Sequence, residues 1–307
     1  MEHKLNRRKF AVTTMMATVA TLAWEPLVSL GNAAPVVTPR RLGLNGGWRV
    51  AQAGKTDWVP AMVPGCVHTD LLAAGKIPDP FYRDNEKAVQ WVGESDWLYQ
   101  RTFEVPAEVL RNDRVLLRCE GLDTLAKIKV NGTEIGYTDN MFRLWEFDVK
   151  SVLHAGENTI EILFKSTFPY FKEKQTDQAP AKWVRERAWV RKEPCSYGWD
   201  WGPVLPSCGI WKNISLETFN RGRIADVLIR QNHSTHQVTL EVEVNAERVG
   251  ATTGPFAAKL SVSHNGKLVA TTRIELANGQ GRGELKIKQP KLWWPAGMGA
   301  QPLYLVE

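Results

Sequence analysis

Apolar and polar residues alternate with a period of two along most of the chain after residue 42. A long example is Trp97–Val105, with the sequence WLYQRTFEV. Successive side chains of a strand point to opposite faces, so this alternation predicts strands that bury one face. Turn residues recur every eight to fifteen residues, a spacing typical of an all-β sandwich or jelly roll.

Shorter stretches of the same kind predict further strands at Val115–Arg118, Ala126–Val130, Thr159–Lys165, Ile210–Phe219, Gln237–Val244, Lys259–Val262, Lys267–Thr272 and Gly283–Ile287. Two Asn-Gly pairs, Asn131-Gly132 and Asn265-Gly266, predict hairpins, because a type I′ turn needs positive φ at both central residues. Only Val67–Ala74, which ends at Gly75, has a convincing helical pattern. We therefore expect strands and loops in the rest of the first half.

The pattern changes twice along the chain. Phe168–Ser207 is rich in Lys, Arg, Trp and Pro without clear alternation, and so long a loop in a compact domain is usually functional. After Phe219, Thr, Val and Ser alternate, which indicates an immunoglobulin-like sandwich; such a sandwich takes about 100 residues. We expect a leader (1–34), a jelly roll (35–219) and an incomplete immunoglobulin-like sandwich (220–307) that stops within the strand-like Leu303–Glu307.

The first 34 residues have the composition of an export signal. Met1–Lys9 is basic, Ala11–Ala23 is uncharged and moderately apolar, and small residues follow at Gly31–Ala34. The pair Arg7-Arg8 resembles the twin-arginine signal of bacteria, which implies a periplasmic or extracellular protein. The apolar stretch has 13 residues, whereas a membrane span needs about 20, so no membrane anchor is expected.

Composition and charge exclude several classes of function. The 307 residues are 43% hydrophobic and 23% charged, as expected of a globular chain, whereas the 13 Trp, more than twice the 6 Tyr, are unusually many. The net charge of +6 includes basic residues of the leader, and no run of five like charges occurs, so nucleic acid is not expected as a partner. His233 and His236 lack Cys or carboxylate partners at ligand spacing, so neither a metal nor another cofactor is expected.

Two features leave alternatives open. Cys66, Cys119, Cys195 and Cys208 allow three disulfide pairings, and the sequence does not choose among them. The run Lys182–Lys192 interleaves basic residues with tryptophans, a pattern that binds single-stranded nucleic acid in some proteins. We favour docking of this run on another domain, because Trp and Arg are enriched in interface cores.

Several stretches together resemble the β-mannosidases of glycoside hydrolase family 2. They are VPGCVHTDLL at 63–72, DPFY at 79–82 with Asn85-Glu86, WVG at 91–93, WLY at 97–99, GLDT at 121–124, VNG at 130–132, CSYGWDWGP at 195–203 and LWWP at 292–295.

The resemblance implies the N-terminal part of an exo-enzyme that removes terminal β-linked mannose from oligosaccharides with retention. Retention uses two carboxylates about 5–5.5 Å apart, which in this family are glutamates of a (β/α)₈ barrel that follows the sandwiches. Such a barrel takes about 250 residues, and the chain of 307 has no room for it. We therefore expect no catalytic residue here, no activity of this chain alone, and a barrel in the same or another chain as partner.

Trp199-Asp200-Trp201 is the candidate substrate-binding segment. By resemblance, this loop lines the pocket for the terminal mannose, and Asp200 holds hydroxyls of that sugar. A carboxylate beside aromatic faces suits a sugar, which presents hydroxyls at its edge and apolar C–H faces. The alternative is structural: the tryptophans pack on the sandwich and Asp200 caps a turn before Gly202-Pro203.

Other polar residues are expected to be structural. Asn85-Glu86 resembles the acid/base pair of these hydrolases but lies in the first β domain, away from any barrel-strand context. Asp96, Asp123 and Asp139 lie at strand ends, where turn or solvated roles are usual, and His68 is expected to be a partly buried structural histidine.

Two rival functions remain. The chain can be a stand-alone carbohydrate-binding or interaction module without hydrolase activity, or the relic of a longer gene. The branch of the family also stays open, because preference for mannose over glucosamine or glucuronic acid resides in the barrel.

Overall fold

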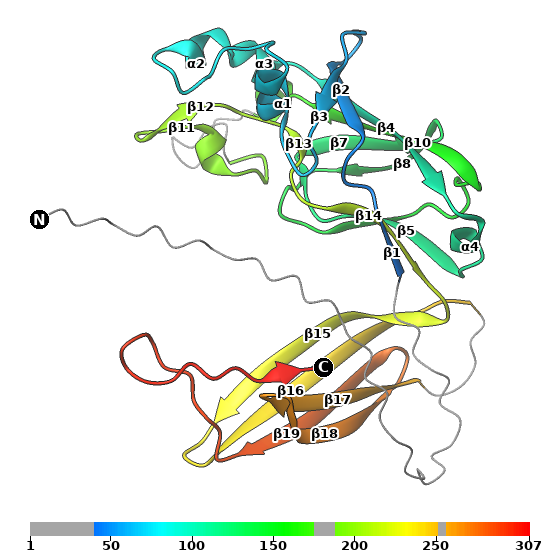
Figure 1. Cartoon of the computed structure of the whole chain (residues 1–307), viewed down its shortest axis with the longest axis vertical. Coiled ribbons are helices and arrows are strands. Elements are labelled where there is room, and N and C mark those ends of the chain that lie inside the picture. The colour runs from blue at the N-terminus through cyan, green and yellow to red at the C-terminus, as the bar shows by residue number, and fades with distance from the viewer. Residues whose placement is uncertain (1–39, 175–187, 251–255) are drawn as a thin grey trace, which may run out of the picture. The chain divides into compact units, whose positions relative to one another are not determined.

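The computed structural model describes residues 40–174, 188–250 and 256–307. Within them, strands form two β regions with separate apolar cores, drawn in blue to green and in yellow to red in Figure 1. Every ladder between these strands is antiparallel. The first region is a jelly roll and the second an immunoglobulin-like sandwich.

Two sheets and two short ladders make up the first region. The six-stranded sheet has the order β3 (Val59–Ala61), β2 (Trp48–Gln52), β4 (Trp97–Val105), β10 (Gly156–Lys165), β7 (Leu125–Val130), β8 (Thr133–Thr138). The four-stranded sheet has the order β1 (Arg40–Gly43), β14 (Ile214–Phe219), β5 (Arg114–Cys119), β9 (Trp145–Asp148). The short ladders pair β13 (Gly209–Ile210) with β6 (Leu122–Asp123), and β11 (Tyr197–Trp199) with β12 (Gly202–Val204).

The core of the jelly roll forms from the apolar side of both sheets. Tyr99 of β4 and Ile162 of β10 are fully buried beside Leu117 of β5 and Leu216 of β14. Tyr99 and Phe164 meet edge to face, with ring centroids 5.4 Å apart, an arrangement that suits the charge distribution of aromatic rings.

The jelly roll contains more helix than its sequence predicts. The predicted helix Val67–Ala74 is confirmed as α1 (Val67–Ala73). The expectation of only strand and loop elsewhere is wrong, since further short helices occur: α2 (Asn85–Ala88), α3 (Gln90–Glu94), α4 (Ala107–Leu110), α5 (Thr167–Lys174) and the 3₁₀ turn η2 (Pro194–Ser196). Most span only one or two turns, too short for helical periodicity to develop in the sequence.

The second region consists of two three-stranded sheets. One has the order β15 (Gly222–His233), β16 (Gln237–Arg248), β19 (Gln280–Lys288). The other has the order β18 (Lys267–Leu276), β17 (Phe256–His264), β20 (Leu305–Val306). Alternate residues of β16, such as Leu240 and Val242, are buried against Leu260 and Ile274 of the facing strands.

Local signals explain where several strands turn or stop. Asn131 and Gly132 have φ of 50° and 79°, and Asn265 and Gly266 have φ of 49° and 74°, so both predicted Asn-Gly turns are confirmed. The strand predicted over Ile210–Phe219 is instead split into β13 and β14.

Further expectations from the sequence concern a membrane anchor, a metal site, the cysteines, the leader and the basic, Trp-containing run. Among the described residues, no helix is long and apolar enough to cross a membrane, and no group of His, Cys, Asp and Glu is arranged to hold a metal ion. Cys66, Cys119 and Cys208 carry free thiols. The predicted leader (1–34) and most of the basic, Trp-containing run, including Trp183, lie outside the described residues.

Candidate functional site

The candidate site is the tip of the hairpin formed by β11 and β12. Trp199 faces Gly202 across this ladder, so Asp200 and Trp201 form its two-residue turn. Asp200 is exposed, Trp201 is 73% exposed and Trp199 is 45% exposed. The structure therefore brings the three predicted residues together at the surface, and the alternative in which both tryptophans pack on the sandwich does not hold for Trp201.

Gly198 allows the hairpin to form. Its φ is 85°, a conformation that residues with a Cβ rarely adopt. A Cβ at this position would also meet Cγ2 of Val204 at 2.7 Å. The glycine of the Gly-Trp-Asp-Trp-Gly segment therefore sets how closely the two strands approach below the tip.

Helices α2 and α3 hold the second strand of the hairpin. The carboxylate Oε1 of Glu86 accepts a hydrogen bond from the backbone N–H of Val204 at 2.7 Å. Gln90 Nε2 donates to the Val204 carbonyl at 2.8 Å and to the Glu86 carbonyl at 2.8 Å. The Asn85-Glu86 pair thus lies in a short helix that supports the candidate site, which agrees with a structural role.

Helix α5 supports the first strand. Tyr197 of β11 packs edge to face on Phe171, with centroids 5.2 Å apart, and lies 6.4 Å from Phe168. Its hydroxyl donates to Oγ1 of Thr167 at 2.9 Å. The hairpin is therefore fixed from both sides, while its tip stays exposed.

A buried ion pair anchors the chain that leads into the hairpin. Lys192 is buried, and its Nζ contacts the carboxylate of Asp123 and donates to the Ser207 carbonyl at 2.8 Å. The expected turn or solvated role of Asp123 is wrong, because Asp123 lies in β6 and is only 6% exposed. Lys192, the last residue of the basic, Trp-containing run, also packs within the jelly roll, and docking of that run on another domain stays a prediction.

His68 lies beside this ion pair and is buried, as a structural histidine should be. Its Nδ1 is 3.1 Å from Oγ of Ser207. Burial, with a smaller contribution from the charge of Lys192, lowers the pKa of His68 to about 4. The imidazole is therefore neutral at physiological pH and cannot serve as a proton donor there.

The remaining sequence candidates have local roles. Asp96 accepts hydrogen bonds from Lys165 Nζ and from the backbone N–H of Ser166, both at 2.7 Å. Asp139 is exposed at the end of β8. Neither carboxylate belongs to the hairpin ladder.

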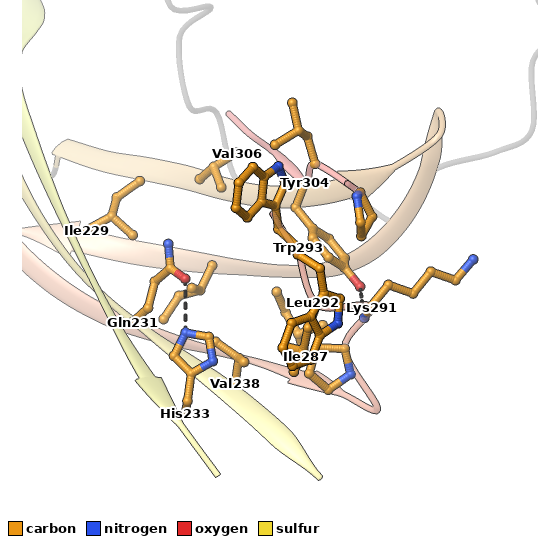
Figure 2. A pocket seen from close by; sticks show the side chains of 15 residues that line it. Ile229, Gln231, His233, Val238, Ile287, Lys291, Leu292, Trp293, Tyr304 and Val306 are labelled. Carbon is orange, nitrogen blue, oxygen red and sulfur yellow. Dashed lines mark hydrogen bonds between the residues drawn. The ribbon is translucent and has the colours of Figure 1, made fainter. Parts of the chain in front are cut away.

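A cavity in the immunoglobulin-like region is chemically different from the hairpin tip. The cavity has a volume of about 490 Å³ and lies between β15, β16 and the segment 290–306. Figure 2 shows Trp293, Leu292 and Tyr304 around it. Its lining is largely apolar. Nε2 of His233 and Oε1 of Gln231 lie 3.2 Å apart. The backbone N–H of Lys291 donates to the Tyr304 hydroxyl at 2.9 Å. The residues that line this cavity include no carboxylate, in contrast to Asp200 at the hairpin tip.

Comparison with known proteins assigns both β regions. Residues 48–212 match the model described as the glycosyl hydrolase 2 galactose-binding domain-like family, and residues 222–307 match the model described as glycosyl hydrolases family 2. These two matches cover most of the residues that the structure describes.

Relatives that are more than 30% identical to this chain include β-mannosidases. The chain is 36% identical over 278 residues to "Beta-mannosidase B" of Emericella nidulans, covering 86% of this chain and 32% of the relative. A crystal structure of a β-D-mannosidase from Dictyoglomus thermophilum superposes with a TM-score of 0.77 and 38% identity, over 87% of this chain and 33% of that one. An exo-chitosanase from Amycolatopsis orientalis, at 19% identity and TM-score 0.62 over 85% of this chain and 30% of that one, shares the fold. The chain thus spans about a third of the length of the relatives it matches.

Proposed function

Because the chain belongs to glycosyl hydrolase family 2, we propose that it forms the N-terminal, sugar-binding part of a retaining exo-β-mannosidase. That enzyme would remove terminal, non-reducing β-D-mannose residues from oligosaccharides. One observation carries the proposal: a carboxylate, Asp200, is exposed between two tryptophans at the tip of a hairpin that is braced from both sides.

The three side chains at the tip have complementary tasks in this proposal. The carboxylate of Asp200 accepts hydrogen bonds from two neighbouring hydroxyls of the terminal mannose, an interaction stronger than one between neutral groups. Trp201 and Trp199 offer apolar faces to the C–H groups of the sugar. A rigid hairpin base limits the conformational entropy that binding would otherwise cost.

Hydrolysis itself is assigned to a different fold. Retention requires two carboxylates about 5–5.5 Å apart, positioned on either side of the glycosidic bond. A (β/α)₈ barrel has parallel strands, whereas every strand ladder of the described residues is antiparallel. We therefore assign cleavage to a barrel in the same or another polypeptide and sugar binding to these residues.

Calorimetric titration of the full chain with β-1,4-mannotriose tests the sugar contact. Asp200→Asn keeps the size of the side chain and removes its charge. A hydrogen bond to a charged group is worth about 1.5–3 kcal/mol, so the dissociation constant should rise by roughly 10- to 100-fold.

Glu104→Gln is the matched control, because it neutralises an exposed carboxylate of β4, outside the hairpin. This variant should bind the trisaccharide as the wild type does. Equal affinities of the wild type and Asp200→Asn would refute the role of Asp200.

A further inference from the structure

Strand β15 lies at one edge of its three-stranded sheet in the immunoglobulin-like region. It is 12 residues long and pairs with β16 along one side, and no strand of the described residues pairs with its other side. Each residue from Ile224 to His233 is exposed, whereas β16 has alternate buried residues. The outer edge of β15 therefore presents a row of backbone donors and acceptors to which another strand can add.

Apolar side chains occupy the middle of this edge. Val227, Leu228 and Ile229 are 42%, 41% and 38% exposed. The ladder pairs Val227 with Val244 and Ile229 with Val242, and both of these partners are buried. A long edge with an exposed apolar centre is the kind that pairs with a further strand, because natural edges are usually short or interrupted by proline.

Charges of opposite sign flank the apolar centre. Asp226 lies two residues before Leu228 and Arg230 two residues after it. Side chains two residues apart share a face of a strand, so all three lie on one face. Arg230 Nη1 donates to Glu243 at 2.7 Å, on the neighbouring strand β16.

We propose that β15 pairs antiparallel with β15 of a second copy of this chain, centred on Leu228. In this register, Leu228 faces its own counterpart on the two-fold axis. Val227 faces Ile229, and Asp226 faces Arg230, once on each side of the axis. A two-fold interface must be self-complementary, and this strand satisfies that condition in both charge and apolar contact. The β15-β16-β19 sheet of one copy and the same sheet of the other copy then form one continuous six-stranded sheet.

Cross-linking tests the register directly. Directly opposed residues of antiparallel strands have Cα atoms about 4.5–5.5 Å apart, within the range of disulfides. The Leu228→Cys chain should therefore form a covalent dimer under mild oxidation. Glu284→Cys is the control, because Glu284 is exposed on β19, at the opposite edge of the same sheet. The wild type, with its four native cysteines, gives the background. Cross-linking of Leu228→Cys no greater than that of Glu284→Cys would refute the register.

Sedimentation velocity tests the charge pairing. The wild-type chain should show a concentration-dependent dimer of twice the 34.6 kDa chain mass. Asp226→Arg places two arginines opposite each other at both ends and should weaken dimerisation by about tenfold. The double variant Asp226→Arg/Arg230→Asp should restore it. A monomer at all concentrations, association only with a different protein, or no rescue by the double variant would each overturn the proposal.

Discussion

At the scale of single residues, the surroundings of a carboxylate decide its role. Asp200 is exposed at a turn, Glu86 accepts a backbone hydrogen bond, and Asp123 is buried against Lys192. A buried charge is tolerated only when it is paired, whereas an exposed carboxylate beside tryptophans is available to a ligand. Sequence alone identifies all three as acidic residues near strand ends or turns. Their burial, and hence their roles, depend on residues far away in the chain.

His68 should make the stability of the jelly roll depend on pH. Its pKa is lowered from 6.5 to about 4, so below pH 6.5 the unfolded chain binds a proton at this residue that the folded chain does not. The free energy of unfolding should therefore fall as the pH decreases from 6.5 to 4, by about 3 kcal/mol in total for this group. Urea unfolding at several pH values measures this slope.

His68→Gln isolates the contribution of the histidine. Burial raises the pKa of the nearby Asp70, which acts in the opposite direction at acidic pH, so the difference between wild type and variant is the informative quantity. His68→Gln should lose the slope between pH 6.5 and 5. The exposed His154, replaced in the same way, should leave the slope unchanged. Equal slopes for all three proteins would contradict the account.

At the scale of secondary structure, alternation predicts strands well where one face is buried. Trp97–Val105 is found within its predicted bounds, and the predicted strand Gln237–Val244 lies within the longer β16. Alternation does not predict the strand β15, because the residues of β15 are exposed on both faces and do not alternate between apolar and polar. Alternation also does not predict the break between β13 and β14, because the pattern over Ile210–Phe219 reads as one strand.

The hairpin of the candidate site could be predicted only in part. The aromatic and acidic residues of its tip are visible in the sequence, and the family resemblance indicates their role. Its supports come from distant segments: Glu86 lies 118 residues from Val204, and Thr167 lies 30 residues from Tyr197. Local patterns carry no information on such contacts, which arise when the sheets fold.

Glu86→Ala should loosen this hairpin. Removing the carboxylate leaves the N–H of Val204 without its acceptor, so the amide should exchange with solvent faster, in hydrogen exchange read on residues 197–204. Glu86→Gln keeps an acceptor oxygen at the same place and should retain most of the protection. Unchanged exchange in Glu86→Ala would show that the hairpin does not depend on this contact.

At the scale of the whole molecule, two β regions of glycosyl hydrolase family 2 are joined in a chain that spans about a third of its relatives. In the proposed enzyme, the jelly roll recognises the sugar and a barrel fold hydrolyses the glycosidic bond. Export of the protein remains a prediction from its leader, which lies outside the described residues.

The central claim, that this chain binds a terminal β-mannoside without cleaving it, is tested most directly by equilibrium dialysis. The full chain is dialysed against β-1,4-mannotriose, and the saccharides in both chambers are separated and quantified by chromatography. The account predicts an excess of intact trisaccharide on the protein side, and less of it with Asp200→Asn. Equal concentrations in the two chambers, or mannose released by the wild-type chain, would contradict it.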